Sequence, residues 1–308
     1  MQTNEKMKDH RSALTGNLAC FTAFAIFGFN IICCKNIAID GNITPMALFC
    51  LRAFGATALF WLWSLFSAPK ERIERQDLWK VALASFFGLF LTQLSFLFAI
   101  TQTTAIDTSI LGTLSPIMTL LISALIGGDR ITWSGGAGVA LSLAGVLILV
   151  FNCVSIGSGA DATSFAGIAG MLVNTLSFAM YVGAFKPVIQ KYSVVTFMKW
   201  MFLFSSLMAL PFAYGAFRAS NLGAVRADVI WQVVYLVVAA TFISYFLVSV
   251  GQQRLRPVVV CMYTYVQPVI AMVIAIAMGL DSLTPLKAMA TLLVFTGVGL
   301  VNFVPKRT

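Results

Sequence analysis

The sequence carries one apolar stretch twice: it reads LSPIMTLLISALIGGDRIT at residues 114–132 and, 152 residues later, VQPVIAMVIAIAMGLDSLT at residues 266–284. Each copy has a proline inside an apolar run and then a Gly-x-Asp-x-x-Thr turn, and each is followed by a Gly-Val pair. At this shift the two halves of the chain align without a gap from Leu78 to Val150. The shared order of these landmarks indicates an internal duplication.

The composition of the chain is that of a protein embedded in a lipid bilayer. Of its 308 residues, 59% are hydrophobic and 10% are charged, and the mean hydropathy is +0.91, whereas soluble domains carry about 25% charged residues. The apolar runs approach the roughly 20 residues that a spanning helix needs, and they do not alternate as barrel strands do. These features exclude an ordinary cytosolic enzyme, a disordered chain and a nucleic-acid-binding domain.

Ten apolar runs predict ten transmembrane helices. They cover residues 15–36, 44–66, 78–100, 104–126, 132–152, 165–186, 194–217, 228–250, 257–280 and 285–304. The fold class is therefore an all-α membrane protein, with one five-helix repeat at residues 13–152 and a second at residues 165–305. Residues 1–12 are polar and basic, and we expect them to form a cytoplasmic tail without structure of its own; residues 306–308 form a short cytoplasmic end.

Each repeat has an odd number of spans, so consecutive copies must insert into the membrane in opposite orientations. Inverted repeats are typical of secondary transporters, whose substrate site lies near the midplane between the halves. We therefore expect a central cavity between the two repeats. Rocking of the halves would open this cavity to each side of the membrane in turn.

The distribution of positive charge predicts the orientation of the chain. With the N-terminus in the cytoplasm, fifteen of the 20 Lys and Arg residues fall inside, Arg52 lies within a span, and four fall outside: Lys35, Arg218, Arg226 and Lys287. The positive-inside rule then places both termini in the cytoplasm, in a multi-pass protein of the inner membrane. This bias explains most of the +9 net charge without a nucleic acid or another polyanionic partner.

The sequence carries no catalytic or cofactor motif. His10 is the single histidine and lies in the polar tail, so a histidine-based metal site or a Ser-His-Asp triad is not expected. There is no GxxxxGK[ST] phosphate loop, and the six cysteines form no CxxC pair and are expected to be buried free thiols. We predict no cofactor, no metal and no enzymatic activity. A membrane-embedded enzyme and a channel are the two alternatives outside the carrier class.

The duplication, with a proline-bearing span, a Gly-acidic turn and a Gly-rich span closing each half, resembles the drug/metabolite transporter superfamily, and above all its EamA-type exporters. The resemblance covers about residues 13–305, although the family usually has Glu where this chain has Asp129 and Asp281. It implies a basket of spans 1, 3, 4, 6, 8 and 9 around the cavity, with spans 5 and 10 behind. It also implies export of amino acids or similar metabolites; nucleosides, amines and drug-like compounds are the alternative substrates.

Polar residues inside the spans identify candidate substrate ligands, because each is costly in lipid unless it faces a cavity or a partner. The repeat pairs polar with polar residues five times: Asn30 with Tyr181, Thr92 with Ser244, Gln93 with Tyr245, Thr113 with Tyr265, and Ser115 with Gln267. We predict that a small-molecule substrate is bound by Asn30, Gln93, Tyr181, Tyr245 and Gln267. Tyr263 joins them because it precedes Gln267 by four residues on one helix face. Interhelical hydrogen bonding is the alternative for these side chains.

Arg52 is the one charge well inside a span, roughly 12 Å deep at about 1.5 Å per residue. It either binds a substrate carboxylate through its planar donor fork or forms an ion pair with Asp107 that acts as a gate, and we favour the ion pair. Lys35 and Lys186 end the first span of each repeat, where they either cap the helix or hold an anion. Asp107 is the only carboxylate clearly inside a span, so proton coupling, exchange and facilitated diffusion all stay open.

Pro116 and Pro268 each remove a backbone donor in the middle of a span. We expect spans 4 and 9 to kink there, so that freed carbonyl groups can line the cavity. Nothing in the sequence separates a monomer from a homodimer, and either is compatible with the predicted carrier.

Overall fold

The computed structural model describes residues 2–66, 71–127 and 163–279, with isolated positions from 137 to 148 and from 284 to 296, and the described residues form helices joined by short loops. Seven helical stretches in these ranges are long and apolar enough to cross a membrane: Ser12–Asp40, Pro45–Phe66, Arg75–Ile100, Ala105–Ile122, Phe165–Ala184, Val194–Arg218 and Ala227–Arg254. A shorter apolar helix covers Pro257–Ala271. The fifth and tenth expected spans lie outside the described residues apart from those isolated positions, so the structure does not establish ten helices.

The elements follow one another along the chain as helices, two of which are π-helices (η1 and η3) and two 3-10 helices (η2 and η4). They are α1 (Gln2–Asp40), α2 (Pro45–Phe66), α3 (Arg75–Ser85), η1 (Phe86–Leu91), α4 (Thr92–Ile100), α5 (Ala105–Gly112), α6 (Ser115–Gly127), α8 (Phe165–Ala184), α9 (Lys186–Lys191), α10 (Val194–Arg218), η2 (Leu222–Ala224), α11 (Ala227–Val237), η3 (Val238–Ile243), α12 (Ser244–Arg254), α13 (Pro257–Met262), η4 (Tyr263–Tyr265) and α14 (Val266–Ala277). The polar tail differs from expectation, because α1 continues back to Gln2. No glycine or proline interrupts residues 2–13, so nothing there stops the helix.

The helix boundaries follow local chemistry. The hydroxyls of Thr104, Ser164 and Ser193 each accept the backbone N–H three residues further on and so begin α5, α8 and α10. At the other end of a helix, Gly41 follows α1 with φ of 71°, a left-handed conformation that favours glycine. These signals explain why the observed spans begin and end close to the positions expected from the sequence.

A π-helix interrupts the third span of each repeat at the same place. η1 lies between α3 and α4, and η3 lies between α11 and α12, 152 residues later. Thr92 Oγ1 donates to Phe87 O at 2.5 Å, and Ser244 Oγ donates to Ala239 O at 3.0 Å, so both hydroxyls reach a carbonyl five residues back. Both repeats therefore contain a π-helical turn at this position, and in each repeat a side-chain hydroxyl donates a hydrogen bond to a backbone carbonyl of that turn.

The fourth span of each repeat is divided into two segments. α5 and α6 are separated by Thr113 and Leu114, and α13 and α14 are separated by the 3-10 helix η4. Pro116 and Pro268 lie in the first turn of α6 and α14. A missing N–H has no helical partner to lose there, so each proline begins the second segment just after the break.

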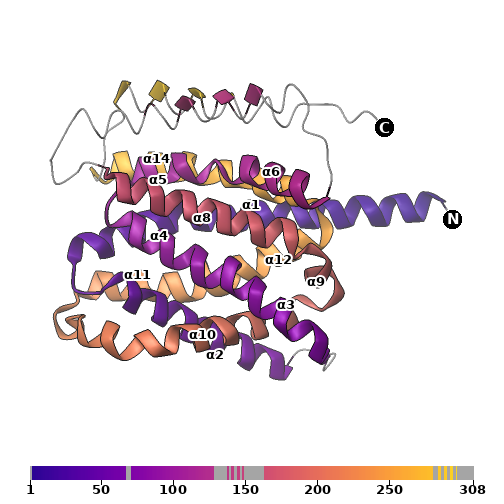
Figure 1. Cartoon of the computed structure of the whole chain (residues 1–308), viewed down its shortest axis with the longest axis horizontal. Coiled ribbons are helices and arrows are strands. Elements are labelled where there is room, and N and C mark those ends of the chain that lie inside the picture. Colours follow the sequence, from indigo (N-terminus) through magenta and orange to yellow (C-terminus); the bar gives the residue numbers. More distant parts are fainter. Residues whose placement is uncertain are drawn as a thin grey trace.

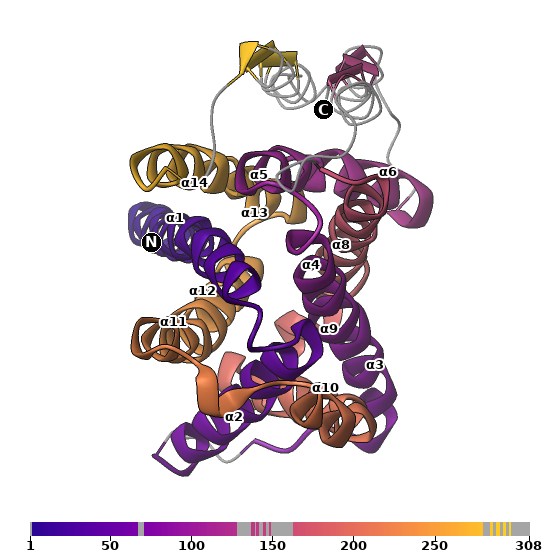
Figure 2. The same ribbon diagram turned by 90° about the vertical axis from the view of Figure 1, so that its left-hand side faces the viewer.

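The two repeats interlock. α1 of the first repeat packs along α12 and α14 of the second, α8 of the second packs along α4 and α6 of the first, and α2 packs along α10. Figure 2 shows α1, α11 and α12 on one side of the bundle and α3, α4 and α8 on the other, with α2 and α10 at its lower end. The long helices run nearly parallel across Figure 1. Elements of both halves therefore surround the middle of the bundle.

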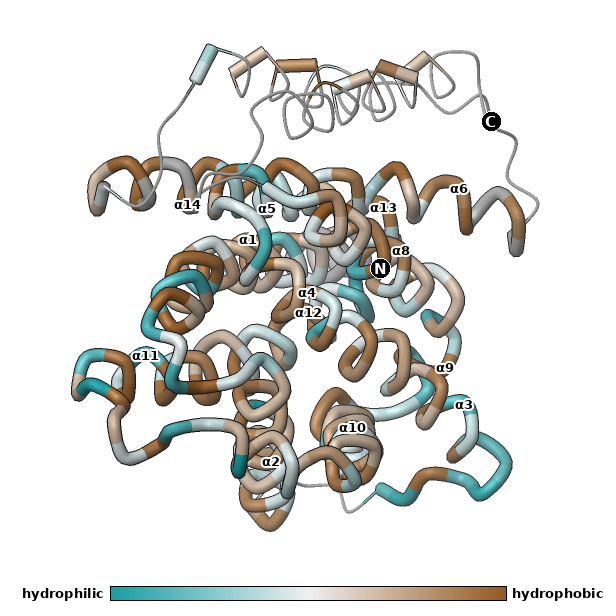
Figure 3. Tube along the Cα trace, turned by 60° about the vertical axis from the view of Figure 1, so that its left-hand side comes forward, coloured by the Kyte–Doolittle hydropathy of each residue, from teal (hydrophilic) through white to brown (hydrophobic). Residues whose placement is uncertain are grey.

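Many large apolar side chains are exposed on the helices, such as Leu62, Leu210 and Val273. Hydrophilic residues gather in loops, for example near the start of α3 (Figure 3). The repeat-related Trp79 and Trp231 are 59% and 73% exposed near the starts of α3 and α11. Tryptophan at such positions is typical of a membrane interface. Because the repeats are inverted, the two indoles lie at opposite ends of the bundle.

The expectation of buried free thiols is confirmed for five cysteines, Cys20, Cys33, Cys34, Cys50 and Cys261. Cys153 lies outside the described residues. Within the described part of the chain, no three His, Cys, Asp or Glu side chains gather in a way that could hold a metal ion. The thiols therefore act as small apolar side chains in the core.

Candidate functional site

A cavity of about 90 Å³ lies between the two repeats and is lined by residues from both of them. Its wall comes from α1, α4, α5, α6, α8, α12, η4 and α14, which correspond to spans 1, 3, 4, 6, 8 and 9. The second span also contributes, through Arg52 of α2. Five of the predicted ligands line this cavity: Asn30, Arg52, Gln93, Tyr245 and Gln267.

Tyr181, a sixth predicted ligand, lies outside the cavity wall. It is fully buried, and its ring packs against Gly88 of η1, where an added Cβ would come within 2.6 Å of the ring. Its hydroxyl donates to Gln252 Oε1 at 3.0 Å. Tyr181 therefore packs within the core, whereas its repeat partner Asn30 lines the cavity.

Tyr263 also lies outside the cavity wall and packs against the apolar core. The prediction placed it on the same α-helical face as Gln267, but residues 263–265 form the 3-10 helix η4. A turn of three residues brings Thr264 onto the face of Gln267, and these two residues both line the cavity. Local helix type, which the spacing alone does not reveal, decides which side chain faces inward.

Arg52 is 2% exposed and lies at the cavity wall. Its Nε donates to Thr241 Oγ1 at 2.9 Å, and one Nη contacts Cys34 Sγ at 3.9 Å. Thr241 belongs to η3 and donates its own hydroxyl proton to Leu236 O at 2.6 Å. Among the ion pairs of the described residues none includes Arg52, so the predicted pair with Asp107 is not formed in this structure.

Asp107 is engaged instead at the start of α5. It is 4% exposed, and Thr163 Oγ1 donates a hydrogen bond to its carboxylate. Thr163 also accepts the backbone N–H of Thr104 at 3.1 Å. The carboxylate thus joins the start of α5 to the residues that precede α8, and it lies outside the cavity wall.

Lys35 and Lys186 make equivalent contacts in the two repeats and do not line the cavity. Lys35 Nζ donates to Thr103 O at 2.7 Å, and Lys186 Nζ donates to Leu255 O at 3.2 Å. Thr103 and Leu255 follow the C-terminal ends of α4 and α12, where a positive charge is favourable. These contacts are those of capping lysines.

The cavity wall also includes side chains that the comparison of polar positions between the two repeats did not predict. Asn174 of α8 donates from Nδ2 to Thr92 O at 2.8 Å. Its counterpart in the first repeat is the apolar Ala23, so the pairing rule does not select Asn174. The amide alone could have identified it, because a polar side chain inside a span indicates a cavity or a polar partner. Much of the apolar wall is aromatic: Phe24, Phe27, Phe96 and Phe178.

Gln93 offers the cavity a hydrogen-bond acceptor. The residue is 3% exposed, and its Oε1 has no hydrogen-bond partner among the described residues. A buried polar group without a partner costs about 1–3 kcal/mol. The wall thus combines an acceptor at Gln93, a cation at Arg52 and an aromatic surface, which suits a molecule with a polar head and an apolar body.

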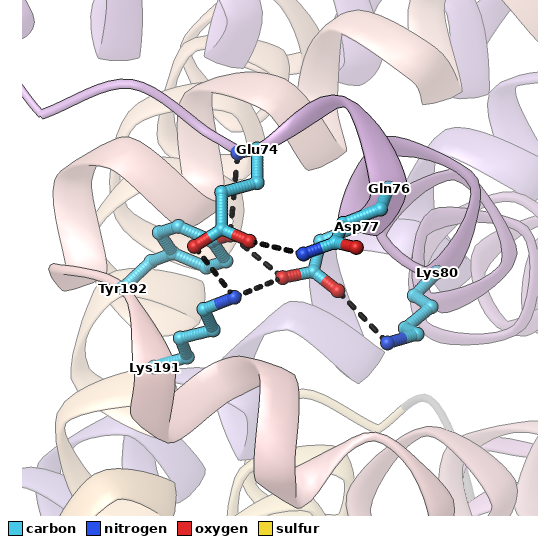
Figure 4. A network of polar contacts seen from close by, with 6 residues as sticks. All are labelled: Glu74, Gln76, Asp77, Lys80, Lys191 and Tyr192. Atoms are coloured by element: carbon cyan, nitrogen blue, oxygen red, sulfur yellow. Dashed lines mark hydrogen bonds and ion pairs between the residues drawn. The ribbon is translucent and has the colours of Figure 1, made fainter.

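A second polar cluster lies at one end of the bundle, where α3 begins and α9 ends (Figure 4). Lys191 Nζ pairs with Asp77 Oδ2 at 2.7 Å and Glu74 Oε1 at 2.8 Å, and Lys80 Nζ pairs with Asp77 Oδ1 at 2.8 Å. Tyr192 donates its hydroxyl to Asp77 Oδ2 at 2.7 Å. The hydrogen bond from Lys191 holds the pKa of Glu74 below its usual value, and the bond to Asp77 raises the pKa of Lys191. This cluster joins the two repeats.

Known proteins resemble this chain over most of its length. A model of the EamA-like transporter family matches it twice, over residues 14–151 and 165–303. An uncharacterized transporter of Archaeoglobus fulgidus is 26% identical over 66% of this chain and 68% of that protein. The uncharacterized transporter YetK of Bacillus subtilis is 26% identical over 66% of this chain and 61% of that protein, so the match spans less than two thirds of YetK. One solved crystal structure shares the fold, with a TM-score of 0.65 and 17% identity over 95% of this chain and 96% of the other.

Proposed function

Because this chain belongs to the EamA-like transporter family, we propose that it is a secondary carrier of small organic metabolites that works by alternating access. The observation that carries this proposal is the cavity between the repeats, which receives side chains from both halves. Rocking of inverted repeats about such a site opens it to one side of the membrane and then to the other.

The proposed substrates are amino acids or related amphipathic solutes, which the carrier exports. The amide groups of Asn30, Gln93 and Gln267 supply polar contacts, and the phenylalanines supply an apolar surface. Ligand sites commonly combine a mostly apolar wall with a few placed polar groups. This combination supports a solute with a polar head and an apolar side chain.

The proposed location is the inner membrane, with both termini and the Lys191 cluster on the cytoplasmic side. The excess of Lys and Arg on that side supports this orientation. The proposed carrier acts as a monomer or as a homodimer.

The proposal is tested by counterflow in proteoliposomes. Vesicles holding the purified protein are loaded with mixed unlabelled amino acids, and the entry of trace labelled amino acids is followed. Saturable accumulation is expected, and Gln93→Leu should reduce it. Thr57→Val is the matched control, since the Thr57 hydroxyl bonds Ser206 at 2.7 Å outside the cavity wall.

Other results of the counterflow assay would point elsewhere. Flux that does not saturate would identify a channel. Failure of every amino acid to accumulate, in protein that elutes as a folded species, would overturn the amino-acid proposal. Nucleosides, amines and drug-like cations would then be assayed in the same vesicles.

A further inference from the structure

The chemistry of the cavity narrows the class of solute. Resting on the proposed function, we propose that the cavity selects solutes with a single carboxylate, that Arg52 binds this carboxylate, and that Thr241 holds Arg52 in position. The solute also carries a hydrogen-bond donor beside the carboxylate and an apolar side chain. Amino acids and 2-hydroxy acids with apolar side chains meet this description, whereas amines without a carboxylate do not.

The pairing of Arg52 is incomplete. A guanidinium has five N–H donors, and the contacts of Arg52 use its Nε, on Thr241, and one Nη, on the weakly accepting sulfur of Cys34. No carboxylate of the described residues lies within ion-pair distance of it. A buried charge inside a membrane protein is costly without a counter-charge. An anionic solute supplies that counter-charge.

The orientation of the Arg52 guanidinium also favours a carboxylate as its ligand. Nε is bonded to Thr241, and one Nη contacts only the weakly accepting sulfur of Cys34. The Nη side of the fork is therefore the part that a ligand at the cavity wall can use. Two parallel N–H donors match the two oxygens of a carboxylate. Thr241 is itself fixed by donating to Leu236 O across η3. It therefore acts as a positioning residue for Arg52 and does not need to touch the solute.

The number and sign of the charges in the cavity wall restrict the charge of the solute. Arg52 is the single charged residue among the described residues of the wall, which include no Asp or Glu. One cation suits one carboxylate, and a dicarboxylate or a phosphate would bring charge that no wall residue offsets. A cationic amine would meet repulsion from Arg52 with no carboxylate to offset it.

Other side chains of the wall suit the rest of the solute. Gln93 Oε1 lacks a partner and lies in the same wall, so it can accept a hydrogen bond from an ammonium or a hydroxyl group next to the carboxylate. Phe24, Phe27 and Phe178 form an aromatic surface for an apolar side chain. The repeat partner of Thr241 is Leu89, so the pseudo-symmetric position lacks the hydroxyl that positions Arg52. The chain therefore builds one anion site, on one side of the pseudo-symmetry axis.

The test compares matched solutes by isothermal titration of the purified full-length protein in detergent. One pair is L-phenylalanine and L-phenylalaninamide, a second is 3-phenyllactate and its amide, and phenethylamine is included alone. The carboxylates are expected to bind about 10- to 100-fold more tightly than the amides, the range for a hydrogen bond to a charged group. Equal binding of carboxylates and amides, or tighter binding of phenethylamine, would overturn the proposal.

Single-residue variants test which side chains produce the preference for carboxylates over amides. Arg52→Gln should abolish the preference for carboxylates, and Thr241→Val should reduce it about 5- to 10-fold while keeping its direction. Thr57→Val, on the same helix as Arg52, should leave binding unchanged. An unchanged preference in Arg52→Gln would refute the role of this residue. If that variant does not fold, the matched pairs on the wild type and the Thr241→Val variant still decide the question.

Failure of this inference can be told apart from failure of the proposed function. Saturable counterflow of neutral solutes that Arg52→Gln does not alter would keep the carrier and reject the carboxylate site. Tight carboxylate binding without any transport in vesicles would keep the site and reject the carrier.

Discussion

At each end of the helical bundle, a segment of one repeat contacts a segment of the other. The duplication relates the contacts at the two ends, but the side chains that make them differ. At one end, which we call the charged end, the start of α3 meets the residues between α9 and α10, through Asp77, Glu74, Lys191 and Tyr192. At the other, which we call the neutral end, the loop after α1 meets the loop after α10. A shift of 151 to 152 residues converts one pair of segments into the other.

The neutral end uses hydroxyls and backbone groups. Thr44 N donates to Ser220 Oγ at 3.0 Å, and Thr44 Oγ1 donates to Ala216 O at 3.2 Å. Asn221 N donates to Asn42 O at 2.8 Å. Arg226 and Asp228 form an exposed ion pair nearby within the second repeat, and the charge of Asp40 in the first repeat attracts Arg226 without forming an ion pair with it.

The difference teaches that the two opening steps of the proposed carrier are unequal. Contacts between the repeats are formed at both ends of this structure, so alternating access requires one set to break at a time. Breaking the charged end separates Lys191 from a buried carboxylate, whereas breaking the neutral end exchanges hydroxyl and amide bonds for bonds to water. Leaving a buried carboxylate without its lysine is the more costly change. We therefore expect the neutral end to open more readily.

The largest effect is expected from Asp77→Asn at the charged end. Asp77 is 3% exposed and accepts bonds from Lys191, Lys80 and Tyr192. Its neutralisation leaves Lys191 with Glu74 alone, so the midpoint of thermal unfolding in detergent should fall by about 5 °C or more. Glu74→Gln is the comparison variant, because Glu74 is far more exposed, and an equal fall in both variants would contradict the importance of burial.

A smaller effect is expected from Thr44→Val at the neutral end. The change keeps the shape of the side chain and removes its bonds to Ser220 and to the carbonyl of Ala216, together with the bond that it accepts from the backbone N–H of Ala47. The loss of neutral hydrogen bonds should lower the melting midpoint by about 2 °C. Ser220→Ala should give a similar value, measured in the same assay. A loss as large as that of Asp77→Asn would show that the two ends are equally strong.

The pH of the medium should act on the contacts between the repeats at the charged end, because Glu74 and Lys191 titrate there. The pKa of Glu74 is lowered from 4.5, so its contribution is complete above about pH 4.5 and is lost as the pH falls through the lower folded pKa. The pKa of Lys191 is raised from 10.5, so its contribution is complete below about pH 10.5 and is lost as the pH rises further. The melting difference between the wild type and Glu74→Gln should therefore be constant between these limits and shrink below the lower one. The difference for Thr44→Val should not change with pH.

The smallest effect is expected from Lys80→Ala. Lys80 pairs with Asp77 at 2.8 Å, but its side chain is 41% exposed and three residues away on the same helix. Exposed pairs of this kind contribute little, so the melting midpoint should change by less than about 1 °C. A shift as large as that of Asp77→Asn would mean that Lys80, rather than Lys191, provides most of the stabilisation at the charged end.

The sequence predicted the helical framework because bilayer burial requires long apolar runs and turn signals end them. The duplication also led to residues of the cavity wall, since Asn30, Gln93, Tyr245 and Gln267 are polar residues paired with polar residues inside spans. The same rule selected Tyr181, whose place depends on a close approach to Gly88 that no spacing reveals.

Other features could not be predicted because they depend on helix type or on distant partners. Tyr263 was expected on the face of Gln267, and the 3-10 helix η4 turns it away. Asp77 and Lys191 lie 114 residues apart in the sequence, and neither is inside an apolar run that would mark it as unusual. Only the packing of the two repeats brings them together.

The paired π-helices bear on the history of the chain. The halves align without a gap across η1 and η3, and both turns carry a hydroxyl bond to a carbonyl five residues back. If each half had acquired its wider turn separately, the two turns would not be expected at the same register. The shape of this backbone therefore predates the divergence of the two copies, and it is older than the side chains that now make the cavity asymmetric. Arg52 and Thr241 have no polar counterparts in the other half, so the two copies have diverged at these positions within a shared frame.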